Sequence, residues 1–135
     1  MTRLLLACMM LTVFLVSVST PPASAATIQC AECGMMVMTD SKFSAKVVQA
    51  GTTLYFCDIG DLFSYLKRKS LNESSIEVKD YPSGATMDAR KAYYVLDAKK
   101  FRTPMGWGVA SFLDKQEASK AGTPLDFESM AKALK

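Results

Sequence analysis

The chain has 135 residues, a formal net charge of +3 and no histidine, and half of its residues are hydrophobic. This length suits one compact domain or two small lobes. The lack of histidine excludes a Ser/His/Asp catalytic triad, and the sequence has no phosphate-binding glycine loop. Its basic residues are spread along the chain rather than gathered in one stripe, which gives little support to nucleic-acid binding.

Residues 1–25 have the organisation of a secretory signal peptide. A positively charged start precedes an apolar core at 4–18, and an Ala-Ser-Ala cleavage sequence ends at Ala25. The apolar core is shorter than the ~20 residues that span a bilayer, which argues against an uncleaved transmembrane anchor. A lipoprotein signal at Cys8 is an alternative, although the sequence stays apolar after that cysteine. We therefore expect export to the periplasm and a mature domain at 26–135.

The first half of the mature chain predicts a β-hairpin followed by a helix. Residues 43–49 alternate and include the valine pair at 47–48, and residues 53–57 form the return strand after a Gly-Thr turn. Asp58 is placed to cap a helix over 59–69, whose apolar residues recur at helical spacing. We assign these elements to a first lobe at about 30–70.

The second half predicts further strands and two helices. Strands are expected at 76–79, 91–96 and 109–113, and helices begin at Asp114 and Asp126. Proline and glycine make 97–108 a loop, and the charged residues at 88–91 fit a solvated turn with local ion pairs. Strands in sequential runs, with helices between and after them, indicate an α+β fold. The second lobe is expected at about 76–122, with a helical tail at the C-terminus.

The segment from Cys30 to Met38 carries five sulfur side chains in nine residues. Soft thiolate and thioether ligands without imidazole favour a thiophilic ion, above all Cu(I). A structural zinc site needs four ligands. The mature chain offers Cys30, Cys33 and Cys57 and no histidine, so the zinc set is one ligand short unless a carboxylate such as Asp58 joins.

The candidate ligands differ in how firmly the sequence supports them. We expect Cys33 to be the anionic anchor, with Met35 and Met105 as neutral thioethers, because both methionines lie in irregular, glycine-containing segments. Cys30 either completes the metal site or pairs with Cys33 in a disulfide. Cys57 is either a ligand or a small buried hydrophobe. The neighbouring methionines at 36 and 38 are expected to serve packing.

Two other functions compete with metal binding. The pair Cys30-x-x-Cys33 in an exported chain could act as a thiol-disulfide oxidoreductase. However, Gly34 follows directly and no clear strand precedes the pair, unlike a thioredoxin-type motif. A third hypothesis is organomercury cleavage by Cys33, Cys57 and Asp58.

Four motifs in a fixed order carry a family resemblance. They are Cys33-Gly34-Met35, the segment 56–61, the segment 87–95 and Pro104-Met105-Gly106-Trp107-Gly108. Over about 30–122 they resemble the NosL family of exported copper-binding accessory proteins for nitrous oxide reductase. The resemblance implies an α+β fold of two small ββα-type lobes, similar to the organomercurial lyase fold. It also implies a single Cu(I) bound by Cys33, Met35 and Met105, with no catalytic turnover.

The resemblance also implies partners for delivery of the ion. These are an ABC-transporter-linked maturation complex at the outer face of the cytoplasmic membrane, or apo nitrous oxide reductase itself. The chain departs from many relatives in two ways, since residues 1–25 favour ordinary signal cleavage over a lipid anchor and no histidine is present. Cys30, Cys57 or another methionine would complete the site. An all-sulfur shell would favour Cu(I) over Zn(II).

Overall fold

The computed structural model describes residues 27–69 and 74–134, so the predicted signal peptide and Cys8 lie outside the described residues. A four-stranded antiparallel sheet has the order β2-β1-β3-β4, formed by Thr52–Phe56, Ala45–Gln49, Ser75–Lys79 and Thr86–Asp88. A second antiparallel sheet pairs β5 (Tyr93–Leu96) with β6 (Val109–Phe112). The helices are α1 (Ile59–Arg68), the 3-10 helix η1 (Ala89–Lys91), α2 (Lys115–Ala121) and α3 (Phe127–Ala133). Within the described ranges, no helix is long and apolar enough to cross a membrane.

The hairpin of β1 and β2 follows from the two residues that join them. Ala50 and Gly51 have φ angles of 47° and 78°. A two-residue hairpin turn with both φ angles positive matches the right-handed twist of the flanking strands. The register then places Ala45 opposite Phe56 and Gln49 opposite Thr52. The hairpin brings the end of β2 back beside the start of β1, where the candidate site begins.

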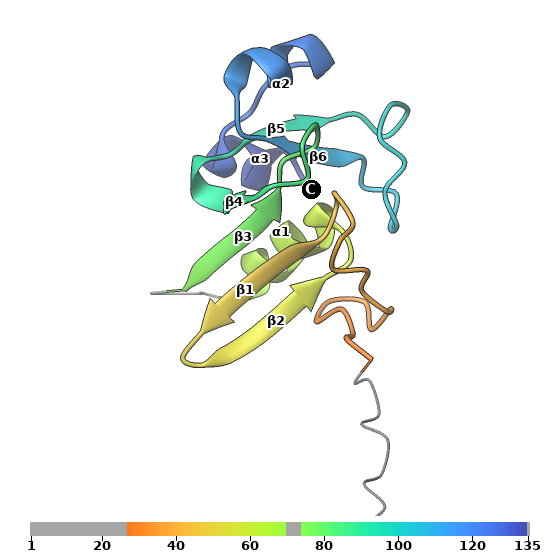
Figure 1. The fold of residues 1–135 in the computed structure, drawn as a ribbon, viewed down its shortest axis with the longest axis vertical. Coiled ribbons are helices and arrows are strands. Elements are labelled where there is room, and N and C mark those ends of the chain that lie inside the picture. The colour runs from red at the N-terminus through yellow and green to blue at the C-terminus, as the bar shows by residue number, and fades with distance from the viewer. Residues whose placement is uncertain (1–26, 70–73, 135) are drawn as a thin grey trace, which may run out of the picture.

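Two hydrophobic clusters hold the elements together. α1 lies against one face of the four-stranded sheet (Figure 1). The larger one lies between the four-stranded sheet and α1, whose Ile59, Leu62 and Phe63 are fully buried. Phe63 also contacts the ring of Phe127 in α3, at a centroid distance of 5.0 Å. The smaller cluster lies beneath α2, where Phe112 packs with Phe101, Val95, Ala110 and Ala118. Apolar area buried in both clusters supplies the main stabilising free energy.

The predicted α+β class and the C-terminal helices are confirmed, and each predicted strand or helix is found within two residues of its expected bounds. The three-residue strand β4 was not predicted. The segment 88–91, expected as a turn, forms the end of β4 and η1, with an ion pair between Lys91 and Asp88 at 3.9 Å. The strands β3 and β4 belong to the predicted second lobe, yet β3 pairs with β1. The two predicted lobes therefore share a sheet.

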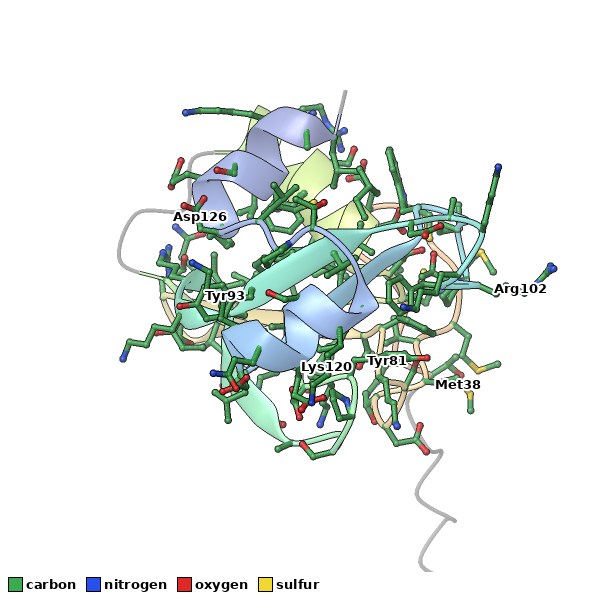
Figure 2. The ribbon with its side chains drawn as sticks, turned by 90° about the horizontal axis from the view of Figure 1, so that it is seen from above. Met38, Tyr81, Tyr93, Arg102, Lys120 and Asp126 are labelled. Carbon is green, nitrogen blue, oxygen red and sulfur yellow. The ribbon has the colours of Figure 1, made fainter. Side chains whose placement is uncertain are left out.

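The packing role predicted for Met36 and Met38 is wrong. Their side chains are 66% and 64% exposed, and Figure 2 shows Met38 pointing outward at the rim of the molecule. Val37, between them, is the residue of this segment that reaches the core, and the methionines on either side of it point away from the core. Met130 of α3, in contrast, is fully buried.

Candidate metal centre

Four side chains from three parts of the chain converge on one point. The thiol sulfurs of Cys30, Cys33 and Cys57 and a carboxylate oxygen of Asp61 all lie within 4.8 Å of one another. The sulfurs of Cys33 and Cys57 are 3.4 Å apart. Asp61 Oδ2 accepts hydrogen bonds from Cys30 at 3.4 Å and Cys57 at 3.5 Å. All three cysteines are free thiols. The sequence singled out these cysteines as candidates but missed Asp61.

A tight turn places the first two cysteines. The backbone N–H of Cys30 donates to the Met35 carbonyl at 2.7 Å, and Gly34 N–H donates to the Cys30 carbonyl at 2.9 Å. Gly34 has a φ of 75°, a left-handed conformation that glycine adopts without strain. Cys30 also forms a parallel bridge with Tyr55 of β2. The turn is therefore fastened to the strand that leads into Cys57, and it directs Cys33 toward that residue.

A second fastening joins the same turn to α1. The Glu32 carboxylate accepts a hydrogen bond from Ser64 at 2.8 Å and forms an ion pair with Arg68. The hydrogen bond from Arg68 lowers the pKa of Glu32, so its carboxylate stays ionised at neutral pH. The turn is thus held from both sides, by β2 and by α1.

The N-terminus of α1 contributes the other half of the centre. Cys57 directly precedes the cap residue Asp58, and Asp61 lies in the first helical turn, where the helix dipole favours negative charge. Asp58 Oδ1 accepts from Gly60 N–H at 2.9 Å, and Oδ2 accepts from Met105 N–H at 3.0 Å. Both oxygens of Asp58 are therefore engaged in structure. The acid that faces the thiols is Asp61, not the Asp58 of the organomercury hypothesis.

The loop 97–108 closes the centre with its tryptophan. Gly108 has a φ of 70°, and a side chain there would meet Ala98 Cα at 2.3 Å, so only glycine fits. The loop places Trp107 Nε1 2.8 Å from Asp61 Oδ1, to which it donates a hydrogen bond. Trp107 is half-buried against the larger hydrophobic cluster. The sequence left its role open, and the structure places it beside the thiol centre.

The backbones of the two methionines predicted as ligands are hydrogen-bonded to residues in or beside the centre. The Met35 carbonyl accepts from Cys30 N–H, and Met105 N–H donates to Asp58. Their side chains are 49% and 41% exposed. Both thioethers are therefore accessible from solvent, while Cys30 and Cys57 are buried and Cys33 is partly exposed. The ligand roles of Met35 and Met105 stay predictions.

Burial sets the protonation of the thiols. Loss of hydration raises the pKa of Cys57 far above its ordinary value and also raises the pKa of Cys33. The free protein therefore holds these groups as neutral thiols at pH 7. Thiol-disulfide exchange requires the opposite, a thiolate with a lowered pKa. The Cys30–Cys33 pair also lies in a turn before β1 rather than at the start of a helix. Both observations argue against the oxidoreductase hypothesis.

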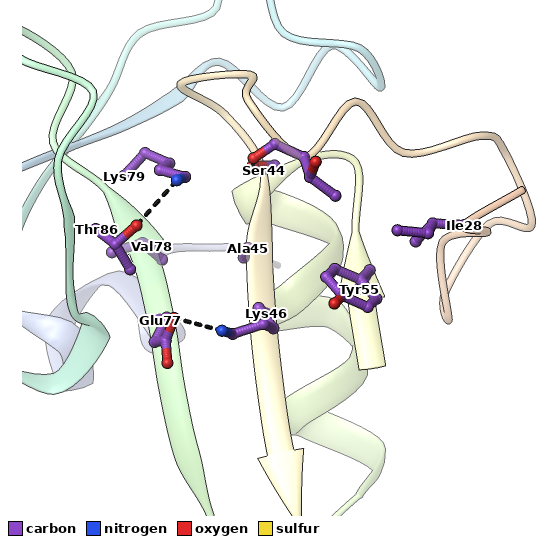
Figure 3. Close-up of a pocket in the computed structure, with 10 residues that line it drawn as sticks. Ile28, Ser44, Ala45, Lys46, Tyr55, Glu77, Val78, Lys79 and Thr86 are labelled. Atoms are coloured by element: carbon purple, nitrogen blue, oxygen red, sulfur yellow. Dashed lines mark hydrogen bonds and ion pairs between the residues drawn. The ribbon is translucent and has the colours of Figure 1, made fainter. Parts of the chain in front are cut away.

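A separate hollow of about 350 Å³ lies over β1, β3 and β4 (Figure 3). Its charged groups have partners within the hollow, since Lys46 pairs with Glu77 at 2.8 Å and Lys79 donates to the Thr86 hydroxyl at 2.9 Å. No cysteine or methionine is found among the described residues that line it. The hollow is therefore distinct from the thiol centre and offers no soft ligand.

The fold and the centre define a small α+β protein with a cluster of three thiols and one carboxylate that could hold a metal ion. The sequence profile of the NosL family matches residues 22–130, so the chain belongs to the NosL family, as its four motifs predicted. The structure is similar to the crystal structure of the copper chaperone NosL from Shewanella denitrificans, with a TM-score of 0.67 and 23% identity. That match covers 84% of this chain and 99% of the other, and at this identity it supports the fold. A comparison with curated protein sequences gives no match.

Proposed function

We propose that this protein is a periplasmic Cu(I) metallochaperone that binds the ion without catalytic turnover. The observation that carries the proposal is the convergence of three free thiols within 4.8 Å, one of them partly exposed. Cu(I) prefers thiolate and thioether ligands. Membership of the NosL family and a fold shared with a protein described as a copper chaperone support the same function.

The arrangement suits an ion that must be bound and later released. Cys57 and Cys30 are buried and would hold the ion away from water, and Cys33 would anchor it at the surface. Met35 and Met105 would add neutral thioether ligands that exchange readily. A sulfur ligand of a partner would attack the ion from the exposed side and displace these residues one at a time. Release therefore needs no unfolding of the domain.

We infer that the receiving partner is the assembly machinery of nitrous oxide reductase or the apoenzyme, as the family suggests. Deleting the gene in a denitrifying host should lower the copper content of purified nitrous oxide reductase, and the Cys33→Ser variant should fail to restore it. Normal copper content in the deletion strain would redirect the search to another copper enzyme.

Titrating the reduced protein with Cu(I) against a competing chelator tests the binding function. Cys33→Ser is expected to weaken Cu(I) binding about 100-fold, equivalent to about 2.8 kcal/mol, because the hydroxyl does not replace a thiolate ligand. Met35→Leu should weaken it by a smaller factor. Met38→Leu is the matched control, since Met38 is an exposed methionine of the same segment. If Cys33→Ser binds as tightly as the parent, the assigned anchor is wrong.

Cu(I) affinity is expected to rise with pH between pH 6 and 8. The raised pKa values of Cys33 and Cys57 leave both groups protonated in the free protein, so the ion must displace a proton from each thiol that it binds. The apparent affinity then gains about tenfold per pH unit for each proton released. Competition titrations at constant ionic strength measure this slope. A flat profile would mean that the ion binds through the thioethers alone.

A further inference from the structure

The carboxylate of Asp61 has no place in a purely sulfur-ligated copper site, yet it faces the thiols directly. We propose that Cys30, Cys33, Cys57 and Asp61 form a four-coordinate site for a divalent ion of the zinc class, in addition to the Cu(I) role. The sequence left a zinc set one ligand short. The structure supplies the fourth ligand, and it is Asp61 because Asp58 is occupied by helix capping and the loop bond.

The dimensions of the cluster fit a tetrahedral ion. A Zn–S bond of about 2.3 Å places the sulfurs of a regular tetrahedron about 3.8 Å apart. The sulfurs of Cys33 and Cys57 are 3.4 Å apart, and Asp61 Oδ2 lies 3.4 and 3.5 Å from the sulfurs of Cys30 and Cys57. No ligand atom lies more than 4.8 Å from another. Side-chain adjustments of about 1 Å or less would therefore close the four ligands around one ion.

The donor types favour zinc over copper for the complete set. Zn(II) is of borderline softness and accepts thiolates together with a carboxylate, and its structural sites are four-coordinate. Cu(I) is softer and gains little from an oxygen ligand. If all three cysteines and Asp61 ionise, the ligands carry four negative charges. A divalent ion neutralises more of this charge than Cu(I) does, and the N-terminus of α1 stabilises part of the remainder.

A hydrogen bond from outside the ligand set already orients Asp61. Trp107 Nε1–H donates a hydrogen bond to Asp61 Oδ1 at 2.8 Å, and the other carboxylate oxygen, Oδ2, faces the thiols. A hydrogen bond to a metal ligand from a neighbouring side chain fixes the direction of that ligand, and its loss commonly lowers metal affinity by about 10–100-fold. Cys57 lies one residue before the N-cap of α1 and Asp61 in its first turn, and Cys57 Sγ contacts Asp61 Oδ2 at 3.5 Å. The carboxylate is thus held in place before any ion binds.

Cu(I) and the zinc-class ion would bind the same thiols, so they would compete for one centre. The Asp61 carboxylate is the ligand that only the zinc-class ion would use. Titrating the reduced mature protein with Co(II), a spectroscopic probe for zinc, tests the proposal. The parent should show the visible ligand-field bands of tetrahedral cobalt and sulfur-to-cobalt charge transfer in the near ultraviolet, at one ion per chain, and Zn(II) should abolish both. Emission from Trp107, the only tryptophan, should fall as paramagnetic Co(II) binds beside it.

The substitution Asp61→Asn is expected to affect zinc-class binding and Cu(I) binding differently. The asparagine oxygen still accepts from Trp107, but a neutral amide is a poor zinc ligand. We expect Co(II) and Zn(II) affinity to fall at least about tenfold, with Cu(I) affinity changed by less than about threefold. The control Asp126→Asn alters the exposed cap of α3 and should change neither affinity. If Asp61→Asn does not fold, Trp107→Phe makes the test from outside the ligand set: it removes the hydrogen bond to Asp61 and leaves every thiol in place, so Co(II) affinity should fall about tenfold while Cu(I) affinity is retained.

Two results would overturn the proposal. One is the absence of tetrahedral cobalt bands in the parent, and the other is equal Co(II) affinity in the parent and in Asp61→Asn, or in the parent and in Trp107→Phe where the asparagine variant does not fold. Either result leaves the Cu(I) titration intact as a separate measurement. Conversely, tight cobalt binding without Cu(I) binding would contradict the chaperone function and support the zinc-class site.

Discussion

The substitution Asp58→Ala is expected to lower the free energy of unfolding by about 3 kcal/mol. The Asp58 side chain is fully buried and makes two hydrogen bonds, one to Gly60 N–H in α1 and one to Met105 N–H in the loop 97–108. Losing an N-cap costs about 1 kcal/mol, and removing the partner of a largely desolvated N–H costs about 1–3 kcal/mol more. Urea denaturation followed by circular dichroism measures the change.

Two control variants divide this effect into its parts. Asp58→Asn keeps an oxygen to cap Gly60, but its amide nitrogen cannot accept from Met105 N–H, so its loss should be intermediate. Asp126→Ala removes a solvent-exposed cap from α3 and should cost only about 1 kcal/mol. If Asp58→Ala costs no more than Asp126→Ala, the bond to the Met105 loop contributes nothing. The Asn variant also loosens the loop that carries Met105 and leaves every thiol in place, which isolates the loop's effect on Cu(I) affinity.

The sequence predicted the elements whose signals are local. Asp58 caps α1 as expected, and Asp114 and Asp126, where two helices were expected to begin, are the caps of α2 and α3. A capping carboxylate acts on backbone N–H groups only two or three residues away. The hairpin turn was expected at Gly51-Thr52 and lies one residue earlier, at Ala50-Gly51, because Thr52 pairs with Gln49 as the first residue of β2. In contrast, β4 has three residues, too few to show an alternating pattern, and it depends on pairing with β3. Its short length explains why it was missed.

The candidate site was predicted in composition but not in arrangement. The three cysteines follow from their residue type, whereas the turn that directs Cys33 to Cys57 depends on a bridge to β2. Asp61 was visible only as an acidic residue in the first turn of a helix. Cys57 precedes the N-cap of α1, so helical spacing gave no signal that Asp61 would face the thiols. The contact between Trp107 and Asp61 spans 46 residues, and no local pattern encodes it.

A second large effect is expected for Gly60→Ala, which should destabilise the protein by about 2 kcal/mol. Alanine in place of glycine normally stabilises an exposed helix position by about 1 kcal/mol. Here a Cβ on Gly60 would lie 2.0 Å from Trp107 Cγ and 2.3 Å from Trp107 Cβ, far inside contact distance. The indole must move, and its hydrogen bond to Asp61 Oδ1 is then lost. The missing side chain at Gly60 is therefore what lets Trp107 reach Asp61.

A double-mutant cycle with Trp107→Ala separates the clash from any other effect of Gly60→Ala. In the Trp107→Ala background the space beside Gly60 is free, so the same substitution should change sign and stabilise by up to about 1 kcal/mol. The coupling free energy between the two positions is then about 3 kcal/mol, at the upper end for residues in contact. Equal destabilisation in both backgrounds would mean that the backbone of α1, rather than the tryptophan, excludes a side chain. The sign reversal would establish that the first turn of α1 and the loop 97–108 are built as one unit around the acid that faces the thiols.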